Sequence, residues 1–502
     1  MPISRDTLAQ AEQILTRRDR GNHAANMGYD SSTHLPEIGL GVHSSLIDLV
    51  ETAHEAVAVL QRILQQEGTT LISSSHHPLD SIHESYLSGV LPKPMYELLR
   101  GKLENTSNLH EGVLETVYPD NPTKGRGWNH EVGTMAASIQ PWNSLSTESA
   151  ASQIGVLQAT GWMFNLLTAN SPYVEGGLSG KRDYRLEMWG PNGFLSTSRY
   201  QSDRDLTENL PEVPKGLTDY FAYVYSHQRP LAVPYQEGEG TAYKTRFMAI
   251  VQPLDNQSYT LLDYLRAESV KAVDIETGEI INIKPNVSHL VNGFDFLYFP
   301  RYGARLRISM PHADAIDPIA FADAIDQRDE KSLLRLLRQG GIENGGFICA
   351  EGRIPATILP TVDRPNWKQF NIPFVLQTAL VRGHKEIMRV LQNSGLSWVD
   401  LTRTLPEATN DIAQGFSATV SGVFATQLAE KIWRIAKKHL KREELALVGN
   451  EIDRILETRQ ASAEEQIHYV ETTLLENPSM IAALLGLLDH QRMVTPTERR
   501  NV

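Results

Sequence analysis

Residues 138–189 have the sequence SIQPWNSLSTESAASQIGVLQATGWMFNLLTANSPYVEGGLSGKRDYRLEMW, and this stretch decides the expected fold. The run TMAASIQPW at residues 134–142 is typical of a strand, and Gln140 lies at its end. Over residues 147–172 the apolar residues recur at helical spacing, which predicts one long helix. A polar segment follows and leads to Arg185. The stretch therefore predicts a strand followed by a long helix.

The flanking sequence extends this alternation of strands and helices. A helical pattern begins after Ser44 or Ser45, either of which can cap it, and Gly68 ends it. In KAVDIETGEIINI, residues 271–283, the Thr-Gly pair predicts a hairpin. Helical patterns dominate from residue 316 onward. We therefore expect a mixed core of strands and helices, followed by a helical C-terminal layer.

Composition excludes several classes of protein. The 502 residues contain one cysteine, so no internal disulfide can form and a reducing compartment fits. The net charge of -13 argues against nonspecific binding to nucleic acid. No apolar run is long enough to span a bilayer. The first residues lack the apolar core of a secretory signal. We expect a cytoplasmic protein that binds neither nucleic acid nor membrane.

Two histidine-bearing segments are candidate sites. His76 and His77 lie at a predicted strand end, and such side chains are common metal ligands. Adjacent residues on a strand point to opposite faces, so a structural role for this pair is the alternative. His130 and Glu131 precede the strand that ends in Gln140, where a polar side chain is costly unless it is paired or used. We take His130 as a candidate substrate-binding residue.

Two arginines on one strand form another candidate site. In ARLRISM, Arg305 and Arg307 are two residues apart, so they share a face of a strand. Two guanidinium groups with a common direction suit a phosphate or a carboxylate. The alternative is a salt-bridged sheet surface with acidic residues opposite.

The order of these segments resembles the central segment of the glutamate–cysteine ligase family. That segment has a strand with Gln or His, a long helix, an Ala-Asn-Ser-Pro turn with an acid and Gly, and an Arg shortly before a Trp. The most specific parts are Asn170–Gly176 and Arg185–Trp189. HLPEIGLG at residues 34–41 and LISSSHHP at residues 71–78 are similar to the family's Glu-bearing strand and to its strand with a His-Pro end.

The resemblance implies an α+β fold of the glutamine synthetase type. In this fold a curved antiparallel sheet forms a funnel flanked by helices, and here a helical C-terminal extension would follow. We expect an N-terminal helix and lead-in at residues 1–30, a ligase-like catalytic core at residues 31–400 and a helical C-terminal region at residues 401–502.

The resemblance also implies a reaction. ATP phosphorylates a substrate carboxylate, usually the γ-carboxylate of glutamate, and an amine such as that of cysteine attacks the acyl phosphate. Magnesium and arginine neutralise the charge that builds on the transferring phosphoryl group. The expected cofactors are ATP and Mg, and the expected partners are glutamate or a similar acid and an amine.

Matching positions give the candidate site residues. The expected roles are metal binding by Glu37, Gln140 and His77, binding of substrate carboxylate or phosphate by Arg185 and Arg307 together with Arg305, and lining of the substrate pocket by Tyr173 and Glu175.

The sequence departs from the family pattern in its acidic residues. The family's first strand carries Gly-x-Glu-x-Glu, and no such strand precedes Glu37. The family's later Glu-x-Arg pattern appears as Arg305-Leu306-Arg307, and the segment around Arg353–Leu359 offers no acid on its strand. Magnesium is usually held by carboxylates, so the expected metal site looks poor in ligands.

Three explanations for the missing acids stay open. The first strand was lost through an incorrectly assigned start, or other residues such as Glu131 and Glu175 bind the metal, or the protein is a degenerate relative. The last explanation predicts a binding or regulatory protein on the same fold, without catalysis.

Overall fold

The computed structural model describes the larger part of the chain. The described residues are 3–18, 25–29, 33–79, 136–188, 208–227, 232–237, 244–251, 259–275, 277–290, 298 and 300–495.

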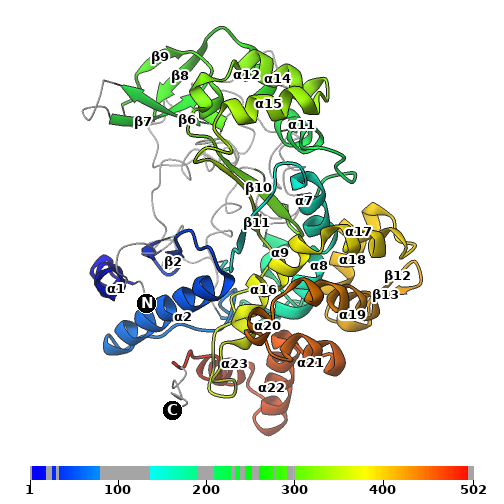
Figure 1. Cartoon of the computed structure of the whole chain (residues 1–502). Coiled ribbons are helices and arrows are strands. Elements are labelled where there is room, and N and C mark those ends of the chain that lie inside the picture. The colour runs from blue at the N-terminus through cyan, green and yellow to red at the C-terminus, as the bar shows by residue number, and fades with distance from the viewer. Residues whose placement is uncertain are drawn as a thin grey trace.

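A three-stranded antiparallel sheet lies at the centre of the molecule (Figure 1). Its order is β10 (Ala304–Ser309), β11 (Phe347–Gly352) and β3 (Trp142–Ser144). Leu306 and Ala350 on one face belong to the main apolar core, in which helix α7 (Ala150–Ala159) packs against the sheet. Because side chains alternate along a strand, the other face carries the polar residues.

The expected long helix is present as two consecutive helices. Helix α7 ends at Thr160, and α8 (Gly161–Thr168) begins directly after it. Gly161 lies so close to the carbonyl oxygen of Tyr302 that a Cβ would stand 1.8 Å from it. The strand expected over residues 134–142 is also displaced toward the C-terminus. The hydrogen-bonded strand is β3, and the described part of the expected strand contributes one isolated bridge, from Ser138 to Ala356.

The close approach at the start of α8 leads to a prediction. Gly161→Ala should lower the free energy of unfolding by about 1–3 kcal/mol, because the methyl group forces the backbone of Tyr302 away. Urea denaturation measures this. The control is Gly155→Ala in α7, where the new Cβ would stand 3.3 Å from the Pro214 side chain and helix propensity improves. Equal stability of the two variants would contradict the prediction.

The N-terminal segment confirms the predicted helices. Helix α1 (Arg5–Arg18) and α2 (Leu46–Gln66) share an apolar cluster with the residues around the hairpin β1 (Asn26–Tyr29) and β2 (Pro36–Gly39). Ser45 caps α2 by accepting the backbone N–H of Asp48 at 3.2 Å. Gly68 ends that helix region with a φ of 72°, a left-handed conformation that glycine adopts without strain.

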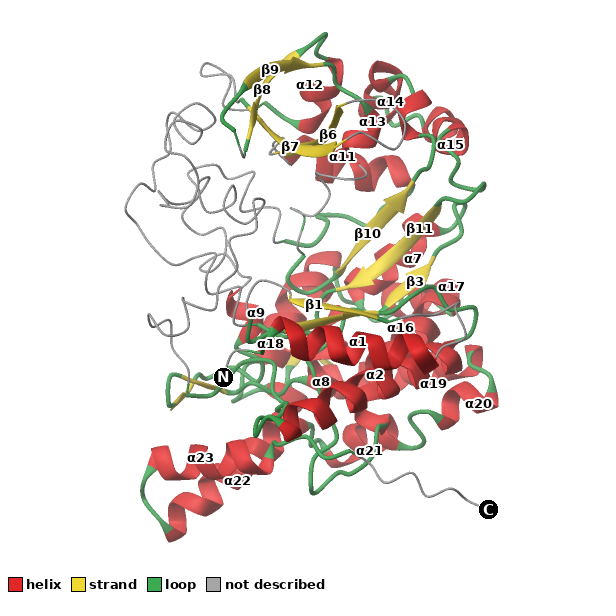
Figure 2. Cartoon of the chain, turned by 90° about the vertical axis from the view of Figure 1, so that its left-hand side faces the viewer, coloured by secondary structure: helices red, strands yellow, loops and turns green. Residues whose placement is uncertain are grey.

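A second antiparallel sheet lies at the opposite end of the molecule from α1 and α2 (Figures 1 and 2). The predicted Thr-Gly hairpin is confirmed as its last two strands. The sheet has the order β6 (Ala232–Glu237), β7 (Lys244–Ile250), β8 (Val270–Asp274) and β9 (Ile280–Ile283). The helices at this end are α11 (Leu217–His227), α12 (Leu261–Arg266), α13 (Val287–His289), η4 (Ala313–Ala315), α14 (Pro318–Asp326) and α15 (Glu330–Gln339).

The C-terminal part is largely helical, as predicted. Residues of this part, such as Trp433 and Ile452, belong to the same apolar core as α7 and α8. The remaining helices are α16 (Lys368–Arg382), α17 (His384–Gln392), η5 (Asp400–Thr404), α18 (Leu405–Asn410), η6 (Gly415–Ser417), α19 (Ala425–Ala436), η7 (Lys437–His439), α20 (Arg442–Ala446), α21 (Glu451–Thr458), α22 (Ser462–Glu476) and α23 (Met480–His490). The remaining short elements are β4 (Tyr173–Val174), β5 (Gly177–Leu178), α9 (Arg185–Met188), β12 (Thr419–Val420) and β13 (Val423–Phe424).

The architecture confirms the α+β class. All pairs of described strands are antiparallel, and they form separate small sheets rather than one continuous funnel among the described residues. None of the helices in the described ranges has the length and apolar character that crossing a membrane requires.

Candidate functional site

The polar face of the central sheet gathers three arginines around one carboxylate. The register of β10 and β11 places Arg305 directly opposite Glu351, and Trp142 of β3 lies opposite Glu351 on its other side. Arg307 is two residues from Arg305 on the same face. Arg353 follows Glu351 at the end of β11 and completes the group. We call Arg305, Arg307, Glu351 and Arg353 the Glu351 cluster.

The hydrogen bonds within the Glu351 cluster are close and partly bidentate. Arg305 donates from Nε to Oε2 of Glu351 at 2.9 Å and from Nη2 to Oε1 at 3.1 Å. Nη1 of Arg353 donates to Oε1 at 2.8 Å. Nε of Arg307 lies 3.1 Å from Oε2, and its guanidinium lies over the Trp142 ring at 5.5 Å from the centroid. Such paired donors hold a carboxylate in one orientation.

The electrostatics of the cluster keep Glu351 ionised. The residue is 1% exposed. Burial raises the pKa of its carboxyl, but Arg305, Arg353 and Arg307 outweigh burial and hold that pKa at about 2. The Arg307 side chain is 28% exposed, so this guanidinium is the one of the three most accessible from outside.

This geometry confirms one prediction and corrects another. Arg305 and Arg307 share a face, as their spacing predicts, and the acidic residue opposite them is Glu351. The interpretation that residues near Arg353 offer no acid on their strand was wrong, because Glu351 lies on β11. The signal was present in the sequence: Glu351-Gly352-Arg353 is itself a Glu-x-Arg pattern.

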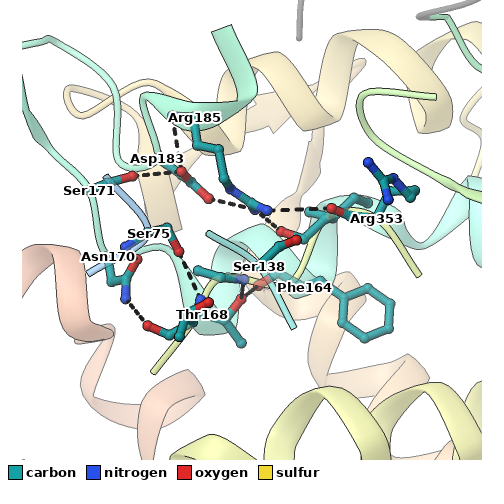
Figure 3. Close-up of polar contacts among 12 residues, drawn as sticks. Ser75, Ser138, Phe164, Thr168, Asn170, Ser171, Asp183, Arg185 and Arg353 are labelled. Atoms are coloured by element: carbon teal, nitrogen blue, oxygen red, sulfur yellow. Dashed lines mark hydrogen bonds and ion pairs between the residues drawn. The ribbon is translucent and has the colours of Figure 1, made fainter. Parts of the chain in front are cut away.

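Arg185 lies beside the cluster but holds protein groups (Figure 3). It is 1% exposed, and its Nη2 donates to Oδ2 of Asp183 at 3.0 Å. The same guanidinium donates to the backbone carbonyls of Arg353, at 3.4 Å, and Ile354. These contacts do not favour the expected role of Arg185 in holding the substrate. They favour a positioning role, because this side chain fixes the backbone that carries Arg353.

The three expected metal ligands come from separate elements. Glu37 is exposed on β2, opposite Gly28 of β1. Gln140 is exposed just before β3, and its Nε2 donates to Oγ of Ser138 at 3.3 Å. His77 is half-buried, and its Nδ1 accepts the N–H of Leu79 at 3.3 Å. Their assignment as ligands stays a prediction.

The strand that pairs with the Glu37 strand carries no carboxylate. This strand, β1, has the sequence NMGY. The three explanations for the missing acids therefore stay predictions.

The expected pocket-lining residues lie on the β4–β5 hairpin. Tyr173 is 3% exposed in an apolar cluster with Val470 and Leu484 of the C-terminal helices, and burial together with Glu471 raises its pKa. This position favours a packing role for Tyr173. Glu175 is exposed in the tight turn with a φ of 48°. The next residue, Gly176, donates its N–H to the carbonyl of Pro78 at 2.9 Å, so the turn lies beside the His77 segment.

His130 and Glu131 lie outside the described residues, and their expected roles stay predictions. Among the residues that the structure does describe, no group of three or more His, Cys, Asp and Glu side chains could hold a metal ion. The described side chains therefore do not by themselves fit a magnesium site, whereas the arginines of the Glu351 cluster have the donor chemistry that phosphate and carboxylate require.

Comparison with known proteins tests the resemblance. The model of the family described as Glutamate-cysteine ligase family 2 (GCS2) matches residues 24–249. This range includes β1, β2, α2 and the 138–189 stretch, and it indicates a ligase of the glutamate–cysteine ligase type. A search among curated proteins found no match. The predicted resemblance is thus confirmed: residues 24–249 match the model of the glutamate–cysteine ligase family.

Proposed function

We propose that this protein is an ATP- and magnesium-dependent carboxylate–amine ligase that forms a γ-glutamyl-type amide bond. The match of residues 24–249 to a ligase family carries the proposal. The Glu351 cluster supports it independently, because an enzyme that joins an acid to an amine with ATP must hold two anions close together. Glutamate or a similar acid and an amine are the proposed substrates.

The arginines supply the charge that this chemistry needs. Guanidinium groups bind carboxylates and phosphates through pairs of parallel hydrogen bonds. Arg307, the most accessible of the three, would contact the substrate anion, while Arg305 and Arg353 hold Glu351 in place. ATP, when bound, supplies the phosphoryl group that turns the carboxylate into an acyl donor. Fixed positive charge near the transferring phosphoryl group lowers the barrier to that transfer.

Magnesium is part of the proposal, but we assign no step to it. Glu351 is engaged by three arginines, and Glu37 lies on a different sheet from the cluster. Titration of ADP release with magnesium tests the requirement for the metal.

The test of the reaction is ADP release with glutamate and a panel of amines that includes cysteine. We expect Arg307→Ala to lower kcat/KM about 100-fold, because a donor to the developing charge is lost. Arg338→Ala is the control, since Arg338 is half-exposed and binds Glu343 on the surface. The absence of ADP release with every pair of substrates would sink the proposal.

A binding or regulatory protein on the same fold is the second candidate. The observation that favours it is the engagement of Glu351 by arginines, which withdraws this carboxylate from metal binding. This candidate predicts binding of a small anion without turnover. Pyrophosphate binding without ADP release, measured on the same sample, would favour it over the ligase.

A further inference from the structure

The segment that leaves β11, residues 353–359, is held by side chains from three other parts of the chain (Figure 3). Arg185 binds its first two carbonyls, as described above. Oγ1 of Thr168 accepts the N–H of Ala356 at 3.2 Å. Ser75 and Ser73 accept the N–H groups of Thr357 and Leu359 at 2.8 and 2.9 Å. We call residues 353–359 the exit segment; its position sets that of Arg353.

Asn170 lies at the centre of this network and uses both ends of its side-chain amide. It is fully buried. Its Nδ2 donates to the carbonyl of Thr357 at 2.6 Å and, more weakly, to that of Ser73 at 3.4 Å. Its Oδ1 accepts the N–H of Ser75 at 3.1 Å. One side chain thus joins the exit segment to residues 73–75, and a satisfied buried network of this kind is rigid.

Helix α22 reaches the same point from the C-terminal region. Nε2 of Gln466 donates to the backbone carbonyl of Asn170 at 2.9 Å, and the N–H of Ala463 donates to that of Ala169 at 2.8 Å. Gln466 is 3% exposed, so this hydrogen bond is shielded from water. The chain of contacts therefore runs from α22 through Asn170 and the exit segment to the Glu351 cluster.

We infer that Asn170 is a positioning residue of the candidate site, and that Gln466 couples the C-terminal helices to the Glu351 cluster through it. The inference rests on the proposed function in so far as the cluster binds the substrate anion. Both side chains are buried and bind protein groups. Both act on the backbone that carries Arg353, which holds Glu351 and, through that carboxylate, the position of Arg307. A small misplacement of an anion-binding group has a large effect on binding and rate.

The first test follows the exit segment itself by hydrogen exchange of the full-length protein. In Gln466→Leu, the amides of Ala356, Thr357 and Leu359 should exchange about tenfold faster, because a buried hydrogen bond that supports Asn170 is lost. Thr472→Val on the exposed side of α22 is the matched control, since its hydroxyl bonds only within the helix, to His468. Unchanged exchange in Gln466→Leu would overturn the coupling whatever the protein catalyses.

The second test separates positioning from mere stability. Titration calorimetry with inorganic pyrophosphate should show about tenfold weaker binding for Gln466→Leu than for the unaltered protein or Thr472→Val. Asn170→Ala should weaken pyrophosphate binding further. If Asn170→Ala does not fold, the comparison of Gln466→Leu with Thr472→Val still tests the inference. Faster exchange with unchanged affinity would overturn the positioning role. If no ADP is released with any substrates yet Gln466→Leu still weakens pyrophosphate binding, the proposed reaction fails while the positioning role stands.

Discussion

Replacing Glu351 with glutamine should lower the free energy of unfolding by about 3–5 kcal/mol, which is the largest effect that we expect from one substitution. The change keeps the shape of the side chain but removes the charge that Arg305, Arg307 and Arg353 contact. Breaking a buried ion pair from one side is costly because the remaining charges stay desolvated. Urea denaturation monitored by circular dichroism measures the loss.

The control for this substitution is a glutamate on the surface. Glu343 pairs with Arg338, and both side chains are about half-exposed. Glu343→Gln should change stability by less than about 1 kcal/mol. Added phosphate should recover part of the stability of Glu351→Gln, since it offers the arginines another anion. If Glu351→Gln unfolds at the same urea concentration as the unaltered protein, the three arginines do not depend on this carboxylate for stability.

Protonation of the Glu351 carboxylate should make the protein less stable as the pH falls. The pKa of Glu351 is about 2 in the folded protein, below the value of about 4.3 that an unfolded chain has. Its contribution, about 3 kcal/mol, is present above the unfolded pKa and is lost as the pH falls through the folded pKa. Between pH 5 and pH 2, we therefore expect stability to fall less steeply in Glu351→Gln than in the unaltered protein, as measured by urea midpoints.

Arg182→Met should be about as damaging as Glu351→Gln, with a loss of about 3–5 kcal/mol in the free energy of unfolding. Arg182 is fully buried and joins the 138–189 stretch to the C-terminal helices. Its Nε and Nη2 donate to the Glu464 carboxylate, and Nη1 and Nη2 donate to the carbonyls of Thr409 and Leu166 at 3.2 and 3.1 Å. Methionine fills much of the volume but removes the guanidinium donor from each of these acceptors, so that the Glu464 carboxylate keeps only the N–H of Ala461 among the donors of the described residues.

Two measurements check this prediction. Urea denaturation gives the loss of stability, and limited proteolysis reports whether α22 and α23 detach first. Arg338→Met is the control, because it also replaces an ion-paired arginine but on the surface. If Arg182→Met and Arg338→Met unfold at the same urea concentration, Arg182 does not anchor the C-terminal helices.

The sequence by itself determined the local elements. The capped helix α2, the hairpin of β8 and β9 and the common face of Arg305 and Arg307 all follow from short-range patterns, and all are confirmed. Such features depend on residues a few positions apart, whose geometry is set by the backbone periods of 3.6 and 2. The resemblance of the 138–189 stretch to the glutamate–cysteine ligase family is likewise a property of one continuous segment.

The tertiary structure decided which residues meet. Glu351 faces Arg305 across 46 positions of sequence, and Gln466 reaches Asn170 across 296. No local period encodes such pairings, because they arise from strand register and from helix packing that bury a shared core. For the same reason Arg185, which looked like a substrate ligand, proved to hold the backbone of Arg353, and Tyr173 proved to pack beneath the C-terminal helices. Sequence alone identified the kinds of side chain that the site needs, and only the fold decided which of them contact one another.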